Sequence, residues 1–193
     1  MTSTRDKILR SAQTLLARSG LSGAGLNPLI ASSGAPRGSL YHYFPEGKEQ
    51  WVGEALRAYS DYFMQVCAGL LAAAPTVGAG IEALLLQLAA QLEKTGFSGG
   101  CPVGAVILDL DADTAALREV CRQIMAVWQA ELASRLTGLA PERQAELAQF
   151  VVINLEGALM LARLQHSSAP LHTSARLLRQ CIDQQLAPTG QSA

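Results

Sequence analysis

The sequence predicts an all-α protein of about nine helices, on three observations. Leu, Ala, Gln, Glu and Arg, which favour helices, dominate the chain, whereas runs of the β-branched and aromatic residues that favour sheets are scarce. Apolar side chains recur every three to four positions through most of the chain, as in amphipathic helices. Hydrophobic residues make up 49% and charged residues 16% of the composition, which is enough apolar material for a core.

The first three helices are short and closely spaced. The first carries an apolar stripe at Ile8, Leu9, Ala12, Leu15 and Leu16, and is expected to end at Gly20. A second helix is expected over 26–33, with Asn27 as its cap. A small-residue break at 33–35 follows, and Pro36 suits the start of a third helix. Two short helices about a three-residue turn form the layout of a helix-turn-helix.

The remaining helices are longer. Pro45 and Gly47 break the chain, and six further helices are expected over 51–74, 81–92, 102–109, 113–137, 141–166 and 171–186. The stretch 150–164 is apolar around nearly its whole circumference, which predicts burial in a core or in a subunit contact. We therefore expect two domains, residues 1–50 and residues 51–193.

Charge is divided unevenly between these parts. Residues 1–50 carry six basic and three acidic side chains, a net +3, and the remainder carries nine basic and thirteen acidic, a net −4, which gives the formal −1 of the whole chain. A basic head on an acidic body is typical of a phosphate-binding protein, because positive charge attracts the DNA backbone. The same imbalance is common among domains that never meet DNA.

Several site classes are not indicated. The four cysteines lie far apart without a Cys-x-x-Cys pair, and the three histidines, at 42, 166 and 172, form no ligand cluster, so neither a metal nor another cofactor is expected. Residues 78–83 resemble the glycine fingerprint of dinucleotide-binding enzymes, but no strand precedes them. We expect no enzymatic activity, and a helical scaffold protein remains an alternative.

The expected location is the cytoplasm. Residues 1–7 are polar and lack the apolar core of a signal peptide. No run reaches the roughly 18 uninterrupted apolar residues of a membrane span, so no membrane partner is expected.

A resemblance to a known family rests on residues 4–50. The run 36–49, PRGSLYHYFPEGKE, resembles the recognition-helix signature of the TetR family of transcriptional regulators. Further positions match at Thr4, Arg5, Ile8, Leu9, Ala12, Leu16, Gly20, Ile30, Ala31 and Gly34. The chain departs from the family at Ala24 and Gly25, where a hydroxyl residue is usual, and in a longer loop at 45–48. These departures and the later segment 100–104 are similar to the LmrA-like branch.

The resemblance implies that the three-helix head binds double-stranded operator DNA. A helix fits the major groove, where side chains of its N-terminal half reach the bases. Arg37 is the candidate for guanine, and Gly38 and Ser39 allow close backbone approach. Tyr41, His42 and Lys48 are expected to contact the phosphate backbone, and Thr4 and Asn27 are further DNA-binding candidates. Leu40 and Phe44 should face inward. Arg37 as a solvated charge and Tyr41 as core packing remain alternatives.

For the body, the resemblance implies a small, mainly apolar effector that releases a repressor from its operator. The candidate pocket residues combine large apolar and polar side chains, namely Phe97, Cys101, Met125, Trp128, Gln129, Phe150, Asn154 and Glu156. Any one of them is an ordinary core residue in the alternative interpretation. Asn154 and Glu156 are the more informative, because a polar group on a buried helix needs a partner.

Two further expectations concern the body. By family analogy, helices 141–166 and 171–186 pair with those of a second copy as a homodimer, and the apolar stretch 151–164 supports this independently. Cys101 lies between Gly100 and Pro102 at an expected helix start, where the helix dipole favours a thiolate. This predicts, as an alternative function, a repressor that senses oxidants or electrophiles through Cys101; a buried inert thiol is the competing interpretation.

Overall fold

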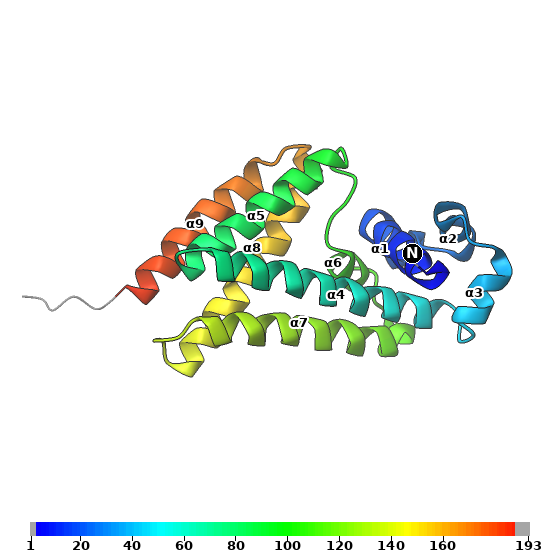
Figure 1. Ribbon diagram of the computed structural model, residues 1–193, viewed down its shortest axis with the longest axis horizontal. Coiled ribbons are helices and arrows are strands. Elements are labelled where there is room, and N and C mark those ends of the chain that lie inside the picture. The colour runs from blue at the N-terminus through cyan, green and yellow to red at the C-terminus, as the bar shows by residue number, and fades with distance from the viewer. Residues whose placement is uncertain (1–2, 188–193) are drawn as a thin grey trace, which may run out of the picture. The chain divides into compact units, whose positions relative to one another are not determined.

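The computed structural model describes residues 3–187, so the outermost residues of both expected domains lie outside the described range. Within that range the chain forms nine α-helices, one short 3-10 helix and no strand (Figure 1). The helices are α1 Thr4–Gly23, α2 Leu26–Ser33, α3 Arg37–Tyr43, α4 Lys48–Ala73, α5 Val77–Lys94, α6 Pro102–Ile107, η1 Ala112–Thr114, α7 Ala115–Arg135, α8 Pro141–Gln165 and α9 Ala169–Leu186. The predicted all-α class is confirmed.

Local side-chain chemistry explains several helix ends. Ser3 caps α1, since its hydroxyl accepts the Asp6 amide at 3.1 Å while the Asp6 carboxylate accepts the Ser3 amide at 3.2 Å. Thr76 caps α5 by accepting the Ala79 amide at 3.0 Å. Pro141 occupies the first turn of α8, where its missing N–H costs no hydrogen bond.

Several helix boundaries differ from the prediction, and three of the differences have a local structural description. The first helix continues to Gly23 across a break at Gly20, whose φ of 65° and ψ of −168° are not helical. The expected helix 102–109 ends at Ile107. The next begins as the 3-10 turn η1, because the Asp111 side chain caps it by accepting the Asp113 amide at 3.0 Å, and α7 then starts at Ala115.

The chain divides into two compact units, residues 1–63 with 99–124 and residues 64–98 with 125–193. The first unit holds α1 to α3, the start of α4, α6, η1 and the start of α7. It contains more than the expected module 1–50 because α6 packs against α1. A functional boundary at residue 50 stays a prediction.

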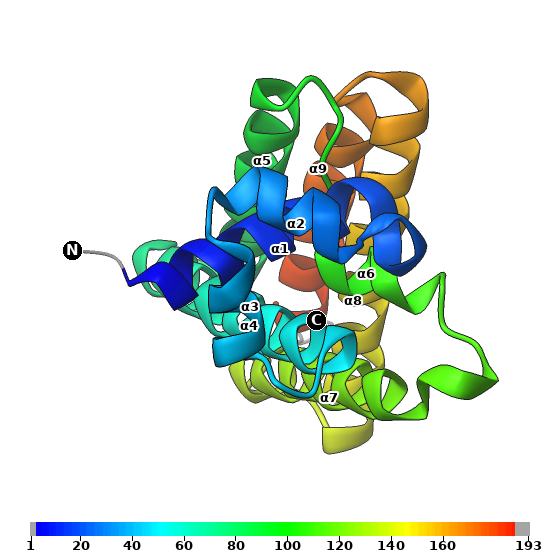
Figure 2. The same ribbon diagram turned by 90° about the vertical axis from the view of Figure 1, so that its right-hand side faces the viewer.

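The first unit is built around the apolar stripe of α1. Figure 2 shows α1, α2 and α3 grouped together at the front. Fully buried side chains from four helices fill its interior, namely Ile8, Ala12, Leu16, Leu29, Leu40, Val52 and Leu56. Burying one such leucine or isoleucine stabilises a fold by about 1.5–3 kcal/mol. This core holds the two short helices in place.

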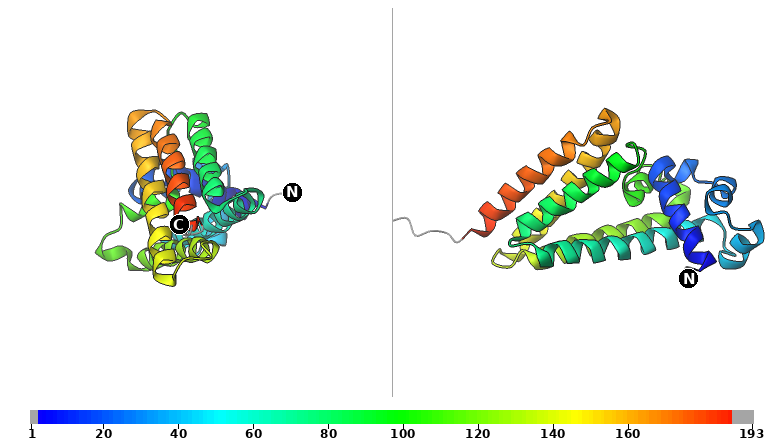
Figure 3. Two further views of the ribbon diagram at one scale, coloured as in Figure 1. Left: turned by 90° about the vertical axis from the view of Figure 1, so that its left-hand side faces the viewer. Right: turned by 45° about the horizontal axis from the view of Figure 1, so that its top comes forward.

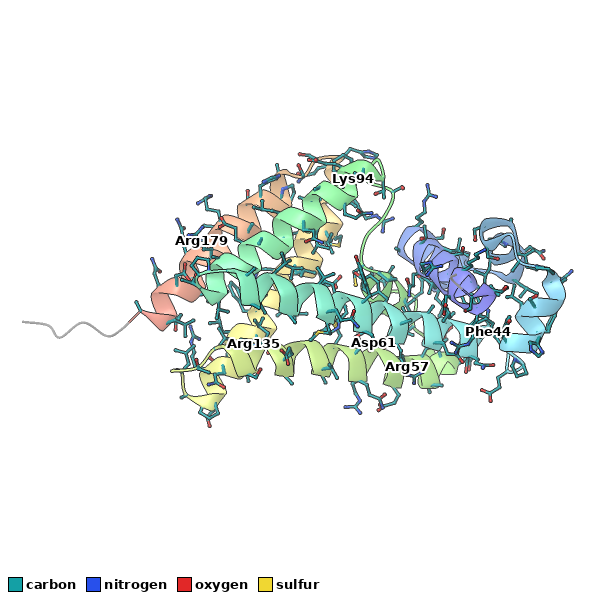
Figure 4. All side chains as sticks on the ribbon, viewed as in Figure 1. Phe44, Arg57, Asp61, Lys94, Arg135 and Arg179 are labelled. Carbon is teal, nitrogen blue, oxygen red and sulfur yellow. The ribbon has the colours of Figure 1, made fainter. Side chains whose placement is uncertain are left out.

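In the second unit, α9 lies beside both α5 and α8 (Figure 3). The buried contacts of α9 come from Leu171, Ala175, Leu178 and Ile182, which follow each other at helical spacing. Arg179, labelled in Figure 4, donates from α9 to the Glu82 carboxylate of α5 at 2.5 Å. Both partners retain exposed surface, so packing contributes more to this contact than the ion pair.

Helix α8 has an unusually apolar composition. Among the described residues it is the one helix long and apolar enough, judged by length and composition, to cross a membrane; its window has a mean hydropathy of 1.5 and is 39% buried. The core helix of a soluble protein meets the same criterion. An apolar helix partly covered by its own chain also matches the subunit contact expected for this segment.

Candidate nucleic-acid interface

The turn between α2 and α3 depends on one glycine. Gly34 ends α2 with a left-handed φ of 64°, and its N–H donates to the Ile30 carbonyl at 3.0 Å. A Cβ at this position would meet nothing within 4 Å, so the backbone conformation, and not space, requires glycine. Pro36 then caps α3. The two helices about this turn have the helix-turn-helix layout.

Two buried anchors orient α3. Leu40 is 2% exposed and Phe44, directly after the helix, 1% exposed, so both face inward as predicted. The Arg5 guanidinium lies over the Phe44 ring at 5.8 Å, which attaches the end of α3 to α1. Four other residues of α3 are exposed to solvent, namely Arg37, Gly38, Tyr41 and His42.

The predicted DNA-contacting residues of α3 lie on this outer face. Arg37, Gly38 and His42 are exposed, and Ser39 is half-buried. Tyr41 is 56% exposed, which argues against its interpretation as core packing. The face therefore presents one guanidinium, an open backbone position and two hydrogen-bonding rings.

The three candidates outside α3 are placed differently. Thr4 is the exposed first residue of α1. Asn27 is exposed in the first turn of α2, but the cap is Gly25 and makes no side-chain hydrogen bond, so the expectation that Asn27 caps this helix is wrong. Lys48 donates its ammonium to the Leu21 carbonyl at 2.7 Å. An ammonium has three donors, so this contact is compatible with a phosphate contact.

The positive charge of the head is reduced by internal pairing. Arg5 donates to the Glu54 carboxylate at 2.5 Å, with 44% and 25% of the two side chains exposed. Lys7, Arg10 and Arg37 are exposed cations.

The expected pocket residues fall into both compact units. Cys101 belongs to the first unit and the other seven to the second. On α7, Trp128 is buried, while Met125 and Gln129 are half-buried. Phe97 follows α5 with a left-handed φ of 57°, and its ring centre lies 5.9 Å from that of His166.

The candidates on α8 are less enclosed than expected. Phe150 is 46% exposed. The Asn154 side chain donates to the Phe150 carbonyl at 2.8 Å, one turn earlier in the same helix, which supplies the partner that its position requires. Glu156 is half-buried. These contacts leave the roles of the three residues in ligand binding as predictions.

The cysteines occupy distinct environments. Cys101 is buried and caps α6, with its Sγ accepting the Gly104 amide at 3.4 Å. Burial raises the pKa of Cys67 to about 12 and that of Cys121 to about 11. These two thiols are therefore protonated at neutral pH. Among the described residues, no group of His, Cys, Asp or Glu is arranged to hold a metal ion.

Sequence reasoning missed Asp109. Its carboxylate accepts the Ser22 amide at 2.9 Å, across 87 positions of the chain. Helical periodicity carries no information on such a distant contact, and an acidic residue after a short helix gives no signal of its own.

Comparison with known proteins agrees with this geometry. Residues 78–177 match the family profile described as the C-terminal domain of LmrA/YxaF-like transcriptional regulators. The chain is 35% identical to the HTH-type transcriptional regulator LmrA of Bacillus subtilis (strain 168) over 170 residues, which covers 87% of this chain and 90% of the relative.

Two solved structures extend the likeness to the fold. The regulatory protein TetR from Rhodobacter sphaeroides has a TM-score of 0.82 at 22% identity, over 93% of this chain and 98% of that one. A cysteine mutant of the TetR family transcriptional regulator CifR, complexed with a 26-bp operator DNA, has a TM-score of 0.77 at 24% identity, over 91% of this chain and 95% of that one.

Proposed function

Because the chain belongs to the TetR family of transcriptional regulators, in its LmrA/YxaF-like branch, we propose that α3 reads operator DNA through Arg37 under the control of a small effector. The observation that carries this proposal is the pair of buried anchors, Leu40 and Phe44, which turns Arg37 and Tyr41 toward solvent. A recognition helix needs this division between a fixed inner side and an open outer side.

Base recognition falls to Arg37 at the start of α3. Its guanidinium matches the two major-groove acceptors of guanine, an interaction that discriminates against other bases by about 1–3 kcal/mol. A Cβ at Gly38 would meet nothing within 4 Å, so the backbone there is open to a phosphate or a base edge. Tyr41 and His42 lie beside it and supply backbone contacts.

The test of this assignment compares two exposed arginines of the head. An operator is first selected from a random duplex library with the wild-type protein. We expect Arg37→Ala to lose about 1–3 kcal/mol on that operator and to relax its sequence preference. Arg10→Ala, which removes another exposed cation, from α1, should keep the preference. Equal sequence preference in Arg37→Ala and wild type would exclude the assignment.

We further propose that two copies associate through α8 and α9. At the angular spacing of an α-helix, the exposed large apolar residues of α8 fall on one side of it, namely Phe150, Ile153, Met160, Leu161 and Leu164. Leu177 of α9 is 50% exposed. A contiguous apolar surface of this kind favours association, and a dimer presents two recognition helices to two operator half-sites.

The effector is proposed to be small and mainly apolar. Met125, Trp128 and Gln129 support this class, because together they offer apolar surface with one hydrogen-bonding amide on α7. The ligand weakens operator binding by favouring a distance between the two DNA-binding heads of the dimer that does not match the operator half-sites. Such a repressor acts at the chromosome, in the cytoplasm, and α8 is then buried in the dimer and not in a membrane.

A second candidate is a repressor that senses oxidants or electrophiles through Cys101. The Gly104 amide donating to Cys101 Sγ at 3.4 Å favours it, since a backbone donor at a helix start stabilises a thiolate. Peroxide oxidises a thiolate to a sulfenic acid and is reduced to water. Release from DNA by peroxide should then be lost in Cys101→Ser. Equal release in both proteins would exclude Cys101 as the sensor.

A further inference from the structure

One peptide group in the DNA-binding unit is held at both ends by side chains of opposite charge. The Lys48 ammonium donates to the Leu21 carbonyl oxygen at 2.7 Å, and the Ser22 N–H donates to Asp109 Oδ2 at 2.9 Å. This C=O and this N–H belong to the same planar peptide unit. Its dipole is negative at the oxygen and positive at the N–H, so the cation and the carboxylate both stabilise it. We name Lys48, Asp109 and this peptide the peptide clamp.

The peptide clamp joins three elements of the first compact unit. Lys48 begins α4, and Asp109 follows α6. The peptide they hold lies in the last turn of α1, just before Gly25 caps α2. Because this peptide lies only a few residues before Gly25, holding it in place restrains the point from which the chain enters α2.

Gly20 makes the close approach of Asp109 possible. A Cβ on Gly20 would lie 2.4 Å from Asp109 Oδ2 and 3.5 Å from the Ala105 carbonyl of α6. Its φ of 65° is also in the left-handed region. Val103 and Val106 of α6 are fully buried, so the Asp109 carboxylate follows directly after a helix that is packed into the core.

Both segments that supply the charges are connected along the chain to the second compact unit. Helix α4 passes into it after residue 63, and the chain returns at residue 99, shortly before α6. Two of the connections between the units are thus continuous with the segments that carry Lys48 and Asp109.

We propose that Asp109 is a positioning residue for operator binding, which fixes the helix-turn-helix relative to α4 and α6 through the Ser22 amide. This inference rests on the proposed binding of operator by α3. Loss of the hydrogen bond leaves every proposed DNA-contacting side chain in place but frees the segment that leads into α2. Operator binding needs a fixed distance between the two DNA-binding heads of a dimer, so it then includes the free-energy cost of ordering this segment. Non-specific DNA binding does not include that cost.

The charge change works in the opposite direction. Removing a carboxylate from a DNA-binding unit favours DNA binding electrostatically. A fall in operator affinity on loss of Asp109 therefore reports on positioning and not on charge.

The test compares Asp109→Ala, Asp109→Asn and the control Asp113→Ala with wild type. Asp113 is an exposed carboxylate in η1, four residues after Asp109, so its removal makes the same charge change. Affinity is measured by fluorescence anisotropy for the selected operator and for an unrelated duplex over a salt series. Thermal unfolding monitors the fold, and hydrogen exchange resolved by NMR monitors the Ser22 amide.

We expect Asp109→Ala to bind the operator about tenfold more weakly, the loss of one charge-assisted hydrogen bond, with an unchanged salt slope. Its affinity for the unrelated duplex should stay within about twofold or rise slightly, and its Ser22 amide should exchange faster. Asn retains a side-chain oxygen that accepts the same N–H, so Asp109→Asn should recover most of the operator affinity. Asp113→Ala should behave like wild type.

Three results would overturn the inference: wild-type operator affinity in Asp109→Ala, an equal loss on both duplexes, or Asp109→Asn as weak as Asp109→Ala. Failure of the proposed function has a different signature, because the wild-type protein itself would then show no preference for any selected duplex.

Discussion

Replacing Ile153 by aspartate tests whether the exposed stripe of α8 joins two protomers. Ile153 is 61% exposed in the single chain. Full burial of an isoleucine is worth about 1.5–3 kcal/mol, so covering the exposed part contributes roughly 1–2 kcal/mol per copy. A two-fold axis places two copies of residue 153 in the interface, so the substitution removes about 2–4 kcal/mol of association free energy. Desolvation of the two introduced aspartates adds to this loss. The dimer dissociation constant should rise roughly 30- to 800-fold.

Val127→Asp provides the matched control. Val127 is 53% exposed on α7, outside the α8 and α9 stripe, so the same charge is added at a similarly exposed apolar position. Sedimentation equilibrium over a range of protein concentrations measures both dissociation constants. We expect wild type and Val127→Asp to remain dimers where Ile153→Asp dissociates. The reasoning is refuted if Ile153→Asp associates as tightly as wild type, or if both variants dissociate alike.

Two other predictions concern packing and thiol chemistry. A Cβ on Gly78 would lie 2.8 Å from the Arg179 carbonyl oxygen, so Gly78→Ala should destabilise the fold by about 1–3 kcal/mol. A Cβ on Gly69 would meet nothing within 4 Å, so Gly69→Ala should stabilise the fold by up to about 1 kcal/mol. Denaturant unfolding at one fixed protein concentration measures both, and equal effects would contradict the packing argument.

With pKa values of about 12 and 11, Cys67 and Cys121 should react slowly with a maleimide at pH 8 in the native protein and rapidly after unfolding. The stability gained from keeping them protonated is complete below the ordinary thiol pKa of 9.0 and is lost as the pH rises toward the folded values. Rapid native labelling at pH 8 would contradict this burial.

The helix-turn-helix was predictable because its signals are local. Gly34 supplies a left-handed turn, and Leu40 and Phe44 repeat at one helical turn, so the inner and outer sides of α3 follow from spacing alone. Exposure of Tyr41 follows from the same geometry. Family resemblance added the DNA-binding role, which periodicity does not contain.

Other features depend on contacts that the sequence does not express. The non-helical Gly20 lies against Asp109, and the two residues are far apart in the chain. Asn154 was expected to need an outside partner, but an asparagine in a helix also bonds the carbonyl one turn back. Phe150 lies on the exposed side of a helix whose apolar residues surround its axis, so composition did not distinguish core from surface.

The central claim is that α3 enters the major groove and that Arg37 reads a guanine there. Replacing each operator guanine in turn by 7-deazaguanine removes a single major-groove acceptor and leaves base pairing intact. When the guanine that Arg37 contacts in each half-site is modified, the wild-type protein should lose about 1.5–3 kcal/mol of binding free energy, roughly 10- to 150-fold in affinity. Arg37→Ala should bind the modified and unmodified duplexes equally. Uniform binding of all modified duplexes by wild type, or the same loss in Arg37→Ala, would contradict the account.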